Sequence, residues 1–106
     1  MVRVGVIQHA PVLLDREATL RQMETLVSQA VVDGAQLIVF PESFLPGYPS
    51  WIWRLAAEDD YVVLASLHAR LLENSVSLKK GALEAIMRSC QEAWGCDCHR
   101  LRRARR

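Results

Sequence analysis

The sequence lacks any long run of apolar residues. No stretch of the 106-residue chain approaches the about 20 residues that a membrane-spanning helix needs. The apolar part of VRVGVIQHA at the N-terminus is short and contains a histidine, which is not typical of a secretory signal. We therefore expect a single small cytoplasmic domain with no membrane partner.

Cysteines are few and odd in number. The chain has three, and without an export signal they are expected to be reduced thiols rather than a disulfide framework. Cys96, Cys98 and His99 form a CxCH string, which lacks the two-residue gap and the second ligand pair of a zinc site. We expect no bound metal.

Positive charge is scarce until the last residues. Residues 1–98 hold eight lysines and arginines against twelve acidic residues, a net of four negative charges, whereas HRLRRARR adds five arginines and no acid. This break sets the C-terminal end of the chain apart from the rest. We expect residues 1–94 to belong to the fold and residues 95–106 to form a basic tail that is disordered or foreign to it. A tail that binds nucleic acid is the alternative, but it has no aromatic stacking surface, so we expect no nucleic-acid partner.

The first forty residues carry a strand, helix, strand pattern. Val2–Gln8 is short, largely apolar and β-branched, which is typical of a strand in a parallel sheet. Asp15 is a predicted N-cap, and Asp33 with Gly34 is predicted to end the helix. Leu37–Phe40 predicts a second strand, parallel to the first and adjacent or nearly so. The apolar stripe of the helix consists of Leu20, Met23, Val27, Ala30 and Val31.

The remaining sixty residues are predicted to be mainly helical. Trp51–Arg54 predicts one helical turn, and Asp60–Glu73 and Gly81–Trp94 predict two amphipathic helices. Two strands cannot bury the apolar faces of so many helices. The sequence therefore predicts an α/β fold that is incomplete, so the chain associates with a partner or forms the opening part of a larger domain.

An acid stands at the end of the second predicted strand. Glu42 follows Pro41, which cannot donate a ladder hydrogen bond, so the strand must stop there. Functional groups gather at the carboxyl ends of strands in open α/β sheets. We expect the Glu42 carboxyl group to be partly shielded from water, which suits a general base. A solvated loop carboxylate is the alternative.

A pattern of nine positions surrounds Glu42: Gly34, Leu37, Ile38, Phe40, Glu42, Leu45, Gly47, Tyr48 and Pro49. This pattern resembles the N-terminal signature of nitrilases and cyanide hydratases, within the carbon–nitrogen hydrolase superfamily. Similarity extends from about Arg3 to Ala93, although His9 stands where a small residue is expected. The PGYPSW string after Glu42 is more similar to nitrilases than to amidases, which remain an alternative.

This resemblance implies a four-layer α-β-β-α sandwich and a Glu-Lys-Cys active site that hydrolyses a nitrile, or an amide, without a cofactor. A family-like homo-oligomer is also implied. Only Glu42 matches this set, as the general base, because Lys79 and Lys80 lie in the wrong segment and the catalytic lysine and cysteine have no match in the chain. A chain with the base alone is expected to be inactive, so a non-catalytic module that docks on a full-length relative is the alternative.

Four further side chains are candidates for a functional role. Tyr48 and Trp51 follow the signature and could line a substrate pocket or pack in the core. Cys90 lies on a predicted apolar helix face, which favours a buried small residue over a nucleophile. His68 is expected to be a surface or packing residue.

The tail has no strand pattern where the family is expected to place its third strand. Read one base later, permitted codons for GCDCHRLRRARR give GVTVIGCDERD, which resembles that strand and its turn. Shifted codons starting in Cys96, Asp97, Cys98 and His99 encode only Val or Ala and Ile or Thr in alternation, whatever the wobble bases. We hypothesise a one-base frame change near Trp94, which sequencing of the coding DNA tests.

Overall fold

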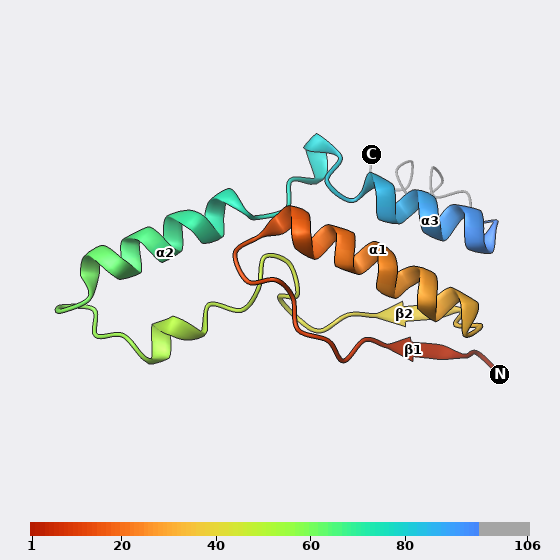
Figure 1. Cartoon of the computed structure of the whole chain (residues 1–106), viewed down its shortest axis with the longest axis horizontal. Helices are drawn as coiled ribbons and strands as arrows, with labels where there is room; N and C mark the ends of the chain where they lie inside the picture. Colours follow the sequence, from red (N-terminus) through yellow and green to blue (C-terminus); the bar gives the residue numbers. More distant parts are fainter. Residues whose placement is uncertain (96–106) are drawn as a thin grey trace, which may run out of the picture.

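The computed structural model describes residues 1–95, which form a two-stranded sheet and a set of helices (Figure 1). This confirms the α/β class. None of the helices in this range has the length and apolar character needed to cross a membrane. The elements in chain order are β1 (Val4–Val6), α1 (Arg16–Val32), β2 (Leu37–Val39), the 3₁₀ turn η1 (Ser50–Trp53), α2 (Tyr61–Glu73), the 3₁₀ turn η2 (Leu78–Lys80) and α3 (Glu84–Trp94).

The two strands pair side by side and parallel, as the strand, helix, strand pattern predicts. Val4 lies opposite Leu37, and Val6 lies opposite Val39. Each strand is shorter than predicted because regular pairing covers only three residue pairs. On the face toward α1, a Cβ atom added to Gly5 would lie only 3.3 Å from the Cβ atom of Ala35. Glycine therefore lets the helix layer approach the sheet closely.

Helix α1 begins and ends where the sequence predicts. The Asp15 carboxylate accepts a hydrogen bond from the Ala18 N–H at 2.9 Å, which satisfies one of the unpaired donors of the first turn. Asp33 is the C-cap, and Gly34 follows with a φ of +82°, a left-handed conformation that favours glycine. The cap and the stop are both confirmed.

The buried core is small and lies between α1, the sheet and the segment after β2. Thr19 is completely buried, and Val27 is 2% exposed. The remaining buried side chains are Ile7, Leu14, Ala30, Ala35, Phe44 and Trp51. Only the face of α1 that meets the sheet is therefore fully covered.

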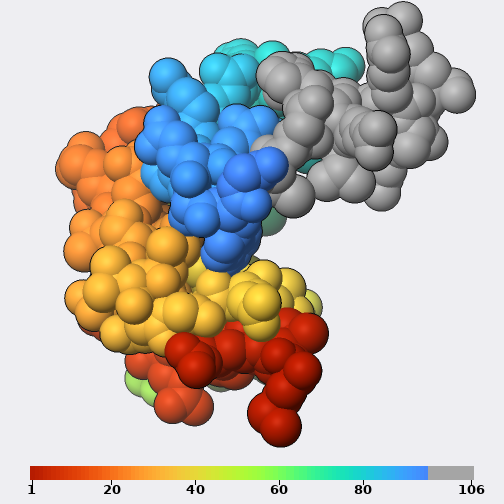
Figure 2. Space-filling model, turned by 90° about the vertical axis from the view of Figure 1, so that its right-hand side faces the viewer, coloured from red at the N-terminus to blue at the C-terminus, as the bar shows by residue number. Residues whose placement is uncertain are grey.

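Helices α2 and α3 have no buried side chains. Helix α3 packs along α1, and Figure 2 shows α3 beside α1, with β1 at the opposite end of the molecule. Helix α2 has no buried residue and extends away from the other elements (Figure 1). Helix α3 starts three residues later than predicted, because Gly81 adopts a φ of +71° and ends η2 instead of opening the helix.

One face of the sheet is open to solvent. Val4 and Leu37 are 48% and 51% exposed, and Val6 and Val39 are 65% and 44% exposed. The register places these four side chains next to one another on the face that α1 does not cover. This confirms that two strands leave the fold incomplete.

Candidate active site

Glu42 lies at the carboxyl-end edge of the sheet, three residues after the last residue of β2. The ends of both parallel strands meet at this edge. Glu42 is exposed, so the partial shielding expected from the sequence is wrong for this chain, because residues 1–95 bring only two strand ends to the edge. Within residues 1–95, Glu42 forms no hydrogen bond or ion pair.

The turn that carries Glu42 is anchored by Phe44. The Phe44 N–H donates to the Pro41 carbonyl oxygen at 3.3 Å, and the Gly47 N–H donates to the Ser43 carbonyl oxygen at 3.0 Å. The Phe44 side chain is 5% exposed, and its ring centroid lies 5.2 Å from that of Phe40. An aromatic anchor on the inner side of the turn thus leaves Glu42 on the outer side.

The segment before α1 supports the same turn. The Leu14 N–H donates to the Pro46 carbonyl oxygen at 3.4 Å. Gly47 has a φ of +109°, and a Cβ atom added there would lie 2.6 Å from the Leu13 Cδ1 atom. These contacts join the end of the turn to residues 13–14.

The Thr19 side chain holds this supporting segment through two hydrogen bonds. This role of Thr19 was not predicted from the sequence. Its hydroxyl donates to the Val12 carbonyl oxygen at 2.9 Å and accepts from the Val12 N–H at 3.2 Å. The position of Thr19 in the sequence could have indicated its burial. Thr19 lies four, eight and eleven residues before Met23, Val27 and Ala30, which places all four side chains on one face of α1. A polar residue in an apolar stripe indicates a specific buried partner.

The aromatic residues after the turn face different environments. Trp51 is buried at 9% exposure, whereas Tyr48 is 53% exposed. The Tyr48 hydroxyl accepts a hydrogen bond of 3.4 Å from the Nε1–H of Trp53, which is 76% exposed. Trp53 was not singled out from the sequence, and it pairs with Tyr48 at the surface while Trp51 packs in the core.

The other candidate residues lie on helical segments. Cys90 is half-buried on α3, and His68 is exposed on α2. Lys79 and Lys80 are exposed on η2. No hydrogen bond or ion pair among the described residues joins His68 or either lysine to Glu42. Cys96, Cys98, His99 and the arginines of the tail lie outside the described residues, so the expectations for them stay predictions.

Comparison with known proteins gives the same family for most of the chain. Residues 3–95 match the family model described as carbon–nitrogen hydrolase. An arylacetonitrilase of Aspergillus oryzae is 38% identical over 91 residues, which cover 86% of this chain and 26% of that protein. A nitrilase of a Bacillus species is 40% identical over 84 residues, which cover 79% of this chain and 24% of that protein.

A nitrilase of Meyerozyma guilliermondii is 46% identical over 59 residues, which cover 56% of this chain and 19% of that protein. The chain therefore spans about a quarter or less of the length of these relatives. Because the family model matches residues 3–95, the chain belongs to the carbon–nitrogen hydrolase family, and its relatives place it in the nitrilase branch.

Proposed function

We propose that this chain is the part of a nitrile-hydrolysing enzyme that carries the general base, Glu42. The observation that carries the proposal is the position of Glu42, on an anchored turn at the carboxyl end of β2 in a carbon–nitrogen hydrolase chain. The names of its relatives, nitrilase and arylacetonitrilase, support a nitrile as the substrate.

In the proposed reaction, the carboxylate of Glu42 takes the proton of a cysteine thiol. The thiolate sulfur then bonds to the nitrile carbon, and a lysine ammonium stabilises the negative charge that develops on the nitrogen. The proton held by Glu42 passes to that nitrogen, which gives a neutral thioimidate and restores the carboxylate. Water adds to the resulting thioimidate, and loss of ammonia leaves an acyl thioester. A second water releases the carboxylic acid and returns the thiol. Loss of the thiol before ammonia gives the amide instead.

The geometry of the turn suits this role. A general base must be held in a fixed position relative to its proton donor, since small displacements reduce the rate strongly. The buried Phe44 ring and the hydrogen bond from Leu14 to Pro46 hold the turn on both sides. The carboxylate of Glu42 itself is exposed and forms no ion pair within residues 1–95, so it is free to receive a cysteine and a lysine from outside this range.

The chain alone is proposed to be inactive, because a base without a nucleophile has nothing to activate. The direct test is ammonia release from aliphatic and aromatic nitriles by the purified 106-residue chain. We expect no release above buffer. Turnover that Glu42→Gln abolishes would contradict this part of the proposal.

A chimera tests the role of Glu42 itself. Residues 1–94 of this chain would replace the corresponding part of the Aspergillus oryzae arylacetonitrilase, so that the relative supplies everything downstream. We expect an active chimera in which Glu42→Gln lowers kcat by a factor of about 10² to 10⁴, as for loss of a general base. Glu58→Gln, at an exposed loop position, is the matched control and should leave kcat unchanged. Equal activity of both variants would refute the assignment.

A further inference from the structure

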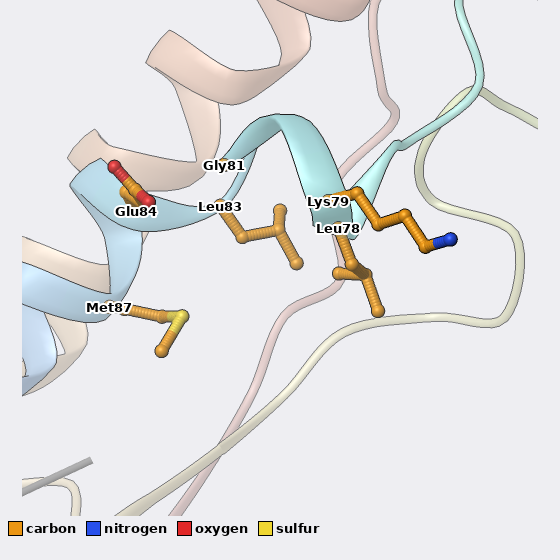
Figure 3. Close-up of a pocket in the computed structure, with 6 residues that line it drawn as sticks. All are labelled: Leu78, Lys79, Gly81, Leu83, Glu84 and Met87. Atoms are coloured by element: carbon orange, nitrogen blue, oxygen red, sulfur yellow. The ribbon is translucent and has the colours of Figure 1, made fainter. Parts of the chain in front are cut away.

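A hollow of about 430 Å³ lies at the N-terminal end of α3. Its apolar lining comes from Leu78, Leu83 and Met87, and Figure 3 shows these side chains projecting to the same side of η2 and α3. Its described lining residues all lie within 78–87, outside the segments that carry and support the Glu42 turn. The contacts that bear on the position of Glu42 lie instead in the connection between β1 and α1.

His9 and Glu42 leave the same edge of the sheet from neighbouring strands. Val6 and Val39 are the last partners in the ladder, and His9 follows Val6 by as many residues as Glu42 follows Val39. The Ile7 N–H continues the pairing by donating to the Val39 carbonyl oxygen at 2.9 Å. The start of the β1–α1 connection therefore lies beside the strand end that leads to Glu42.

Gln22 of α1 bonds to this connection at two points. Its Nε2 atom lies 2.7 Å from the Nδ1 atom of His9 and 3.0 Å from the carbonyl oxygen of Ala10. The two hydrogens of one amide nitrogen serve both acceptors. His9 is exposed, so the hydrogen bond, and not enclosure by other side chains, fixes its ring.

The hydrogen-bond geometry assigns the proton of the neutral His9 ring to Nε2. The Nδ1 atom accepts from the Gln22 amide, and a proton on Nδ1 would oppose the Gln22 N–H across 2.7 Å. The Nδ1 atom is also 3.1 Å from the Ala10 carbonyl oxygen. With the Gln22 amide reversed, its Oε1 atom would face that carbonyl oxygen at 3.0 Å, and two acceptors would oppose each other.

This orientation of Gln22 has a cost. Its Oε1 atom is buried and has no hydrogen-bond partner within residues 1–95. An unpaired buried oxygen reduces stability by about as much as a hydrogen bond adds. Gln22 therefore contributes little net stability, and its two hydrogen bonds serve to fix the position of residues 9–10.

The β1–α1 connection supports the turn of the proposed general base. Thr19, one helical turn before Gln22, bonds to both backbone groups of Val12. Farther along, the Leu14 N–H donates to the Pro46 carbonyl oxygen at the end of the turn. Gln22 thus fixes the start of the connection, Thr19 fixes its middle, and Leu14 joins it to the turn.

We propose that Gln22, through His9 and Ala10, is a positioning residue for the general base Glu42. This inference rests on the proposed function, because it concerns the place of the Glu42 carboxylate relative to the thiol that it deprotonates. A displacement of about 1 Å caused far from the reacting atoms lowers a rate by up to about 10². Loss of the Gln22 hydrogen bonds should therefore reduce kcat and leave substrate binding and stability nearly unchanged.

The chimera with the downstream part of the Aspergillus oryzae arylacetonitrilase tests this role. Gln22→Met keeps the length of the side chain and removes both hydrogen bonds together with the unpaired oxygen. We expect kcat to fall by about tenfold or more, with KM and Tm nearly unchanged. Gln29→Met is the matched control and should keep kcat, since Gln29 is an exposed residue of α1 without a side-chain hydrogen bond within residues 1–95.

Two outcomes in the chimera would overturn the positioning role. Unchanged kcat in Gln22→Met, with Glu42→Gln still damaging, would refute this inference and leave the proposed function intact. A fall in kcat that a fall in Tm accompanies would assign Gln22 a structural role only.

Variants of His9 test the contact from the other side. The side-chain oxygen of asparagine can take the place of Nδ1 and accept from Gln22, whereas alanine has no acceptor. We expect His9→Asn to retain the kcat of the chimera more fully than His9→Ala does. Equal kcat of the two variants would contradict the role of this contact.

Nitrogen NMR of the full 106-residue chain tests the contact without any activity. At about pH 8, where a histidine of ordinary pKa is neutral, we expect Nδ1 of His9 to carry no proton and its chemical shift to change in Gln22→Met. His68 is the internal control and should not change, since it is exposed on α2 and forms no side-chain hydrogen bond within residues 1–95. A protonated Nδ1, or an unchanged shift, would overturn the proposal even if the variant chimera does not fold.

Discussion

The hydroxyl of Thr19 pairs with both backbone groups of Val12. It donates to the carbonyl oxygen at 2.9 Å and accepts from the N–H at 3.2 Å, across seven residues of sequence. Thr19 is completely buried, so no solvent competes for these bonds. A single side chain therefore fixes the segment that supports the turn of Glu42.

Thr19→Val tests this arrangement, because valine keeps the volume and removes the hydroxyl. The Val12 N–H would lose its partner, and the Val12 carbonyl oxygen would keep only the bond from the Asp15 N–H at 3.2 Å. We expect the free energy of unfolding to fall by about 1–3 kcal/mol. Thr25→Val is the matched control, since the exposed Thr25 hydroxyl bonds only to the Arg21 carbonyl oxygen of its own helix. Urea denaturation followed by circular dichroism measures both variants, and an equal effect of the two would contradict the role of Thr19.

Gly47→Ala tests the close approach between the turn and Leu13. The added Cβ atom would lie 2.6 Å from the Leu13 Cδ1 atom, and the φ of +109° is unfavourable for alanine. Gly95→Ala is the control, because its φ is also positive, at +60°, but no side chain within residues 1–93 lies within 4 Å of the added Cβ. We expect a clearly larger fall in Tm for Gly47→Ala. A fall of the same size would show that conformation, and not contact with Leu13, requires glycine at residue 47.

Asp15→Ala tests the cap of α1. Loss of the hydrogen bond to the Ala18 N–H should reduce the free energy of unfolding by about 1 kcal/mol. Asp59→Ala removes the same charge from an exposed loop position without removing a cap, and it should have little effect. Thermal unfolding at two salt concentrations separates the cap from a general charge effect, because screening alone would change both variants equally.

Val6→Thr and Val27→Thr compare the open face of the sheet, where Val6 lies, with the face of α1 that packs on the sheet, where Val27 lies. Val6 is 65% exposed, so threonine there should leave stability nearly unchanged and reduce self-association of the sheet face. Val27 is 2% exposed, and an added hydroxyl there should cost about 1–3 kcal/mol. Light scattering and urea denaturation measure the two effects. Strong destabilisation by Val6→Thr would mean that the open face is covered in solution.

The elements of this fold were largely predictable because their signals are local. Asp15 and Gly34 mark the ends of α1 through hydrogen bonds and backbone preferences within one helical turn. The start of α3 was predicted three residues too early, because Gly81 and the helical pattern after it do not reveal that this glycine ends η2. Predicted helix boundaries are wrong where the same residue could end one element or begin the next.

The environments of side chains in the candidate site were less predictable. Trp51 and Trp53 stand two residues apart in the same 3₁₀ turn, yet one is buried and the other pairs with Tyr48 at the surface. The exposure of Glu42 likewise depends on how many strand ends meet at its edge of the sheet. Such properties depend on packing between distant segments, which periodicity does not report.

The sequence by itself determined the α/β class, the order of the elements and the place of Glu42 directly after a strand. These follow from hydrophobic spacing and turn residues, which act over a few neighbouring positions. Only the tertiary structure decided that the Thr19 hydroxyl bonds to Val12, that the Trp94 indole N–H bonds to the Ala35 carbonyl oxygen, and that one face of the sheet stays open within residues 1–95. Burial and long-range hydrogen bonds depend on which elements pack together, so they become visible only in the folded chain.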